Sequence, residues 1–205
     1  MTIIIKKIIN RLLKFFQISN IPNNENVVYL TFDDGPEPGI CEFVLDVLRK
    51  YDFKATFFCR GDNAEQYQTL MNRIIDEGHS IGNHTNSHLH AYSTSSKQYL
   101  DDIEKANQLL HSTLLRPPFG CLTLTTWLSL MSKYRIIYWS LGSGDSNLED
   151  FDFEQCYHNL ITHTSSGDII LFHFCRLHEN ETRELLPAYC KWLRDNRFIS
   201  ESIKL

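Results

Sequence analysis

The sequence predicts an α/β fold in which parallel strands form a barrel. Short apolar runs alternate with longer segments of helical periodicity along most of the chain. This alternation is typical of parallel strands joined by right-handed crossovers. Carboxylate and imidazole side chains stand at the ends of several expected strands, which is where parallel barrels carry their active sites. A chain of 205 residues with 42% hydrophobic residues can bury the core of one such domain.

The hydrophobic pattern assigns the elements in order. Apolar, β-branched and aromatic runs predict seven strands, at residues 27–32, 54–59, 80–83, 113–116, 135–139, 168–174 and 197–203. Helical periodicity between these runs predicts six helices, at residues 40–51, 64–77, 95–110, 124–133, 152–164 and 183–196.

Two adjacent carboxylates follow the first expected strand. Residues 31–36 read TFDDGP and contain Asp33 and Asp34. Neighbouring side chains on a strand point to opposite faces, so both carboxylates can reach one cleft only where the chain leaves the strand. Like charges this close repel unless a cation lies beside them. The pair therefore indicates a metal ligand next to a catalytic base.

A histidine pair supplies further ligand candidates. His84 and His88 are four residues apart, and in a helical turn this spacing places both imidazoles on one face, as metal-binding pairs require. One carboxylate and two histidines form a facial triad that leaves positions open for water and substrate.

These motifs resemble those of the polysaccharide deacetylases, the family 4 carbohydrate esterases that include chitooligosaccharide and peptidoglycan deacetylases. The resemblance extends from about Val27 to the C-terminus. Five segments stand in the family's order: residues 31–36, 84–88, 116–120 (RPPFG), 139–145 and 171–173. It implies an irregular, incomplete (β/α) barrel, usually of seven strands.

The resemblance also implies a metal-dependent hydrolase. Asp34, His84 and His88 would hold a divalent cation, zinc or else cobalt or another ion, and Asp33 would be the general base. Arg116 would pair with Asp33 and orient it.

The remaining roles come from the later motifs of the family. The backbone N–H of Phe119 would help to bind the oxyanion, and His173 would be the general acid for the leaving amine. Asp145 would tune that histidine, and Leu171 would line the pocket for the acetyl methyl group. The other histidines, His90 and His178 among them, are expected to be structural or exposed.

Three positions depart from the family pattern. Ser140 stands where members often have Asp, and Ser146 stands where an aromatic residue walls the methyl pocket. Phe174 follows the candidate acid, where many members have Asp. The metal and base motifs are intact, so these departures concern the acid side and the shape of the pocket.

The charge and cysteine content limit the function classes. A formal net charge of −5 argues against a nucleic-acid-binding protein. The six cysteines are scattered without a CxxC pair, which favours reduced thiols in a cytosolic setting. Cys59 and Cys175 are expected in the core.

The first twenty residues differ from the remainder. We expect residues 1–20 to form a basic amphipathic segment. The catalytic domain is expected to follow at residues 21–205. On a helix, Ile5, Ile8, Ile9, Leu12, Leu13, Phe15 and Phe16 share one side, whereas Lys6, Lys7, Asn10, Arg11 and Lys14 share the other. This pattern is typical of a membrane-surface segment, and a helix packed on the barrel is the alternative.

Neither a spanning helix nor a secretory signal is expected at the N-terminus, because charges interrupt the apolar run and a small-residue cleavage site is missing. The expected location is the cytoplasm or the inner face of the membrane, with peripheral contact through residues 1–20.

The leading hypothesis is removal of acetyl groups from an N-acetylated glycan by metal-activated water. An O-acetyl esterase acting on carbohydrate is the nearest enzymatic alternative. A non-catalytic glycan-binding module on the same scaffold is the alternative from a different class. A lipid-linked glycan is a further substrate hypothesis.

Overall fold

The computed structural model describes residues 17–23 and 25–204. Its strands are β1 (Val27–Asp33), β2 (Ala55–Cys59), β3 (Ser80–Asn83), β4 (Leu114–Leu115), β5 (Arg135–Ile136), β6 (Leu141–Gly142), β7 (Ile169–His173) and β8 (Ile199–Ser200). Its α-helices are α2 (Ile40–Tyr51), α3 (Gly61–Gln66), α4 (Gln68–Asp76), α5 (Ser96–Leu110), α6 (Leu124–Leu130), α7 (Phe153–His163) and α8 (Glu179–Asp195). Two single 3-10 turns, η1 (Pro118–Gly120) and η2 (Arg176–His178), follow β4 and β7.

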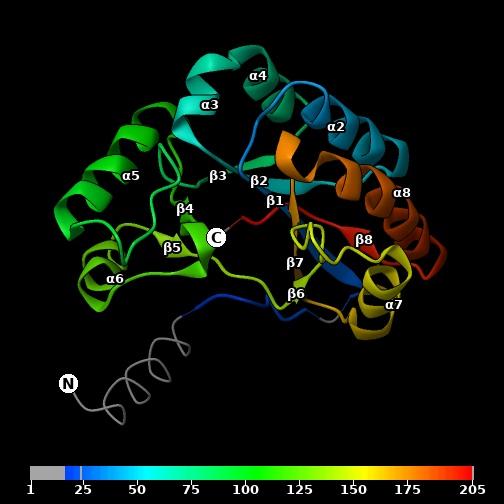
Figure 1. The fold of residues 1–205 in the computed structure, drawn as a ribbon. Helices are drawn as coiled ribbons and strands as arrows, with labels where there is room; N and C mark the ends of the chain where they lie inside the picture. Colours follow the sequence, from blue (N-terminus) through cyan, green and yellow to red (C-terminus); the bar gives the residue numbers. More distant parts are fainter. Residues whose placement is uncertain (1–16, 24, 205) are drawn as a thin grey trace, which may run out of the picture.

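The strands form one curled parallel sheet, as the sequence predicts. Seven strands run in the order β5-β4-β3-β2-β1-β7-β6, and β8 pairs with the beginning of β1. Figure 1 shows the helices in an arc around the outside of this sheet. The result is an incomplete barrel, because no strand pairing joins β5 to β6 among the described residues.

The segment at residues 17–22 spans the side of the sheet that the helices leave open (Figure 1). Ile18 bridges Ile137 in parallel fashion, and Asn20 bridges Asp168 in antiparallel fashion. Most of the basic amphipathic segment expected at residues 1–20 lies outside the described residues, but its last part, at residues 17–20, therefore pairs with the barrel.

Alternation along the central strands separates two environments. On β1, Val28, Leu30 and Phe32 belong to the large apolar cluster beneath the outer helices. Tyr29 contacts a second apolar cluster, which includes Phe58 and lies inside the barrel. Successive side chains of a strand point to opposite faces. Thr31 and Asp33 therefore point inward with Tyr29.

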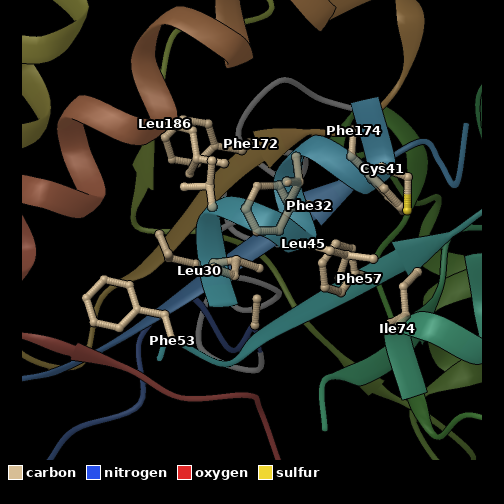
Figure 2. Packing of buried hydrophobic residues seen from close by; sticks show 14 of the residues in the cluster. Leu30, Phe32, Cys41, Leu45, Phe53, Phe57, Ile74, Phe172, Phe174 and Leu186 are labelled. Atoms are coloured by element: carbon tan, nitrogen blue, oxygen red, sulfur yellow. The ribbon is translucent and has the colours of Figure 1, made fainter. Parts of the chain in front are cut away.

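Aromatic rings fill much of the outer core. Phe32 stacks on Phe57 with ring centroids 5.1 Å apart, and Phe174 meets Phe57 edge-on at the same centroid distance. Figure 2 shows these rings between the strands and α2, whose Leu45 points toward them. This burial is the main favourable contribution to the stability of the sheet.

Local signals explain where α2 begins and ends. The Glu42 carboxylate accepts a hydrogen bond from the Gly39 backbone N–H (2.6 Å), which satisfies a donor at the helix start. Asp52 ends the helix in the left-handed region, with φ at 56°. Asx side chains tolerate that region better than most.

The structure corrects several expected boundaries. The helix expected at residues 64–77 is two helices, α3 and α4, which meet at Tyr67. The Tyr67 backbone is not helical, and its ring packs against the outer core, so tertiary packing overrides local helix propensity there. The strand expected at 135–139 ends at Ile136, and a separate short strand, β6, follows at 141–142.

Other elements keep their type and change their length. The helix expected at 183–196 begins earlier, at Glu179, and the last expected strand is reduced to Ile199–Ser200.

All six cysteines are free, in agreement with the expectation of reduced thiols. Within the described part of the chain, no helix has both the length and the apolar character needed to cross a bilayer.

Gly82 of β3 provides a test of the inner packing. A Cβ atom at this position would lie 2.3 Å from a ring carbon of Phe58, which is fully buried. We expect Gly82→Ala to lower the free energy of unfolding by about 1–3 kcal/mol through overpacking. Urea denaturation followed by circular dichroism measures this change.

Gly142→Ala is the matched control on β6. The nearest atom to its added Cβ would be Trp139 Nε1 at 3.9 Å, an ordinary contact. We expect a change within about 0.5 kcal/mol. Equal midpoints for the two variants would contradict the tight packing of Phe58 against β3.

Candidate metal centre and active site

The site lies where parallel strands end at one edge of the sheet. Asp33 and His173 are the last residues of β1 and β7, and they are direct partners in the register of these strands. His84 immediately follows β3, and Arg116 immediately follows β4. The fold therefore brings together four side chains that are far apart in sequence.

The carboxylates of Asp33 and Asp34 diverge because the chain turns between them. Asp33 is the last residue of β1, whereas Asp34 has a φ of 79°. This left-handed conformation is uncommon outside glycine, although aspartate tolerates it. It directs Asp34 toward the two histidines while Asp33 stays with the inward side chains of β1.

The histidines lie in a loop, which corrects the expected helical turn. Residues 84–90 form no helix, and Thr85 and His88 have φ values of 62° and 56°. The two imidazole centroids are nevertheless 5.1 Å apart. His84 Nδ1 donates to the Arg116 carbonyl (2.8 Å), which leaves Nε2 with a free lone pair.

Asp34, His84 and His88 could hold a metal ion. Asp34 Oδ1 lies 3.3 Å from His84 Nε2 and 3.0 Å from His88 Nε2. This oxygen is buried and has no hydrogen-bond partner in the described structure. Burial raises the pKa of Asp34, but the two imidazoles outweigh it and hold the pKa well below its usual value. An unpaired oxygen facing two ring nitrogens is the donor set of a zinc-type cation.

Arg116 holds Asp33 from inside the barrel. Its guanidinium is 0% exposed and donates from Nη1 to Asp33 Oδ1 and to Thr31 Oγ1, both at 2.8 Å. Nη2 donates to the Tyr138 carbonyl (2.9 Å), and the group lies 4.1 Å from the ring centroid of Phe58. Burial lowers the pKa of Arg116, and Asp33 opposes that shift. Burying a charged group is costly, and these hydrogen bonds and the ion pair with Asp33 offset the cost of burying the guanidinium.

His173, at the end of β7, is hydrogen-bonded to Asp145, which lies in the chain after β6. Its Nδ1 lies 2.9 Å from Asp145 Oδ1, and its backbone N–H donates to Oδ2 (2.7 Å). Burial lowers the pKa of His173, but Asp145, with smaller contributions from Asp33 and Asp34, raises it to about 9. The imidazole is therefore protonated at neutral pH.

Phe119 forms the wall next to the histidines. It has a φ of 59°, and its exposed ring lies 4.7 Å from the His88 ring and 5.0 Å from the His90 ring. Phe119 also lines a cavity of about 530 Å³. The cavity is rich in aromatic side chains, namely those of Tyr92, Phe119, Trp127, Tyr138 and Trp139. Leu171 is buried on β7, two residues before His173.

The three departures from the family pattern have local explanations. The Ser140 hydroxyl donates to Asp168 (2.7 Å) and so ties the start of β6 to that of β7. Phe174 is fully buried in the outer core, and its ring occupies the space that a Cβ at Gly35 would need. Ser146 is exposed, so it does not wall a pocket.

Several supporting residues escaped the sequence analysis. The Thr182 hydroxyl donates to Asp145 Oδ2 (3.0 Å), and Ser143 Oγ accepts from the Asp145 backbone N–H (3.2 Å). Thr31 links Arg116 to the Ile170 carbonyl. Threonine and serine are common residues, so their presence alone does not indicate a role. Strand alternation, which turns Thr31 to the same face as Asp33, is the one signal that could have found Thr31.

His178 was expected to be structural or exposed, and the structure places it beside the site. It is buried, and its ring lies 4.7 Å from that of His173. Cys175, which was expected in the core, is buried just beyond the end of β7.

Comparison with known proteins shows which family the chain belongs to. The family model described as polysaccharide deacetylase matches residues 20–136, more than half of the chain. The chain belongs to the polysaccharide deacetylase family. It is 33% identical over 159 residues to a peptidoglycan-N-acetylglucosamine deacetylase of Bacillus cereus, with 75% of each protein covered.

Two further comparisons extend the family relationship. The chain is 30% identical over 166 residues to the chitooligosaccharide deacetylase of Azorhizobium caulinodans, which covers 77% of this chain and 78% of that protein. The crystal structure of the Bc1960 peptidoglycan N-acetylglucosamine deacetylase superposes with a TM-score of 0.86 at 27% identity, over 94% of this chain and 92% of the other.

The Arg116–Asp33 pair gives a stability prediction. We expect Arg116→Met to lower the free energy of unfolding by about 3–5 kcal/mol, because the substitution leaves a buried carboxylate without its partner. Arg49→Met is the control, since Arg49 pairs with Asp46 at the exposed surface and should change stability by less than about 1 kcal/mol. Similar losses in denaturant titrations of the two variants would refute the role given to Arg116.

The His173–Asp145 pair gives a pH prediction for the metal-free protein. Because the folded-state pKa of His173, about 9, lies above its usual 6.5, its stabilising effect is complete below pH 6.5 and is lost as pH rises through about 9. We expect Asp145→Asn to lower this pKa and remove that dependence. NMR titration of the imidazole, with Asp150→Asn as an exposed-carboxylate control, measures the change. An unchanged His173 pKa in Asp145→Asn would contradict the assigned cause.

Proposed function

We propose that this protein is a metal-dependent N-deacetylase that removes acetyl groups from N-acetylated amino sugars of a glycan. The observation that carries the proposal is the juxtaposition of the Asp34–His84–His88 cluster with Asp33 and His173, the register partners at the ends of β1 and β7. A bound divalent cation, zinc in this proposal, would polarise the acetyl carbonyl and lower the pKa of a water molecule.

The side chains supply the proton transfers. Asp33, fixed by Arg116 at 2.8 Å, accepts the proton of the attacking water as general base. His173, protonated at neutral pH, donates a proton to the departing amine. The backbone N–H of Phe119 stabilises the oxyanion, and Leu171 contacts the acetyl methyl group.

The aromatic cavity supports a glycan substrate. Sugar rings pack their C–H faces on aromatic side chains. The cavity beside Phe119 offers such faces, and the Phe119 ring that lines it also contacts His88. Named relatives that act on peptidoglycan and chitooligosaccharides support the same substrate class.

The test is acetate release from N-acetylated oligosaccharides, peptidoglycan fragments and O-acetylated sugars, with zinc or cobalt added. We expect release from the N-acetylated substrates, loss of activity on chelation, and a fall of about 10²–10⁴-fold in kcat for Asp33→Asn, which removes the base. Asp46→Asn, at an exposed carboxylate, should retain the wild-type rate.

The panel also separates the alternatives. Faster release from the O-acetylated sugars would indicate an esterase. Glycan binding without release, unaffected by Asp33→Asn, would indicate a binding module and reject the proposed hydrolysis.

A further inference from the structure

A second group of metal-binding side chains lies next to the first. Cys175 and His178 belong to the short segment between β7 and α8, and they are only 6% and 7% exposed. Cys175 Sγ, a ring nitrogen of His178 and a carboxylate oxygen of Asp34 all lie within 4.8 Å of one another. Asp34 thus belongs to both groups that the described residues form.

An unpaired nitrogen independently points to a ligand in this second group. Nδ1 of His178 is buried and has no hydrogen-bond partner in the described structure. A buried polar atom without a partner is destabilising, so an atom of this kind in a folded protein requires an explanation. Coordination of a cation by this imidazole would satisfy it.

The chemistry of both side chains suits coordination. Both are largely buried, and imidazole nitrogen and thiolate sulfur are the usual ligands of zinc in proteins. A thiol that coordinates a cation gives up its proton, so cation binding at this site would release a proton to solvent.

We propose that Cys175, His178 and Asp34 bind a second divalent cation, with the Asp34 carboxylate shared between the two sites. Thiolate and imidazole ligands select zinc or cobalt over the hard cations magnesium and calcium. Carboxylates that bridge two cations about 3.5–4 Å apart are common in two-metal hydrolases. The proposal goes beyond the deacetylation argued above and does not require it, since cation binding is measured separately from acetate release.

The second site follows from where β7 ends. His173 points inward as the last residue of the strand, and η2 then turns the chain so that His178 lies beside it, with ring centroids 4.7 Å apart. A cation held there would lie on the His173 side of Asp34. Its charge would then be close to the group proposed to protonate the leaving amine.

The experiment is reconstitution of the full chain with Co²⁺, followed by desalting, elemental analysis and near-ultraviolet absorption. We expect about two cations per chain and a thiolate-to-cobalt charge-transfer band. Cys175→Ser should abolish the band and reduce binding to about one cation. Cys156→Ser, a sulfur-to-oxygen change at a half-buried cysteine of α7, should keep both cations and the band.

A second variant separates loss of the cation site from misfolding of the Cys175→Ser protein. His178→Asn leaves the thiol in place and should weaken the second cation by at least about tenfold, while circular dichroism confirms the fold. Binding of about one cation by the wild type, absence of a thiolate band, or a stoichiometry unchanged in Cys175→Ser would each overturn the second site. Acetate release from the same samples tests the proposed deacetylation separately.

Discussion

The buried ion pair between Arg116 and Asp33 is the interaction on which the rest of the site depends. A fully buried guanidinium is costly to desolvate, and the structure surrounds it with Asp33, Thr31, two backbone carbonyls and the face of Phe58. These partners come from β1, β2 and the chain beyond β5. The ion pair therefore fixes the candidate base and at the same time joins distant parts of the barrel interior.

Strand alternation separates an apolar outer face of the sheet from an inner face that carries the polar residues of the site. The outward residues of β1 and β7, such as Phe32 and Phe172, are apolar and pack beneath the helices. The inward residues Thr31, Asp33 and His173 place polar groups in the interior, close to the rim. A slip of one residue between β1 and its neighbours would exchange the two sets, so the apolar core itself specifies the register that assembles the site.

Local patterns predicted much of the fold and the composition of the candidate site. Short continuous apolar runs identified β1, β2 and β7, and the Asp-Asp and His-x-x-x-His spacings identified the residues that lie together. The left-handed backbone at Asp34 and His88 was not predictable, because sequence spacing carries no record of backbone torsion in a loop. The partners of Arg116 and the unpaired Nδ1 of His178 depend on contacts between residues far apart in the chain, which periodicity does not report.

The last described residues close the base of the barrel, and this affects the order of folding. Ser200 Oγ accepts a hydrogen bond from the Leu30 backbone N–H (3.1 Å), and Ile203 is buried among interior side chains with its N–H on Thr56. During synthesis, Leu30 therefore lacks its partner until 170 further residues have been added, and Thr56 lacks Ile203 until 147 have been added. Until β8 is made, the first residues of β1 present backbone groups without their native strand partner, and unpaired strand edges of this kind are where other chains can pair.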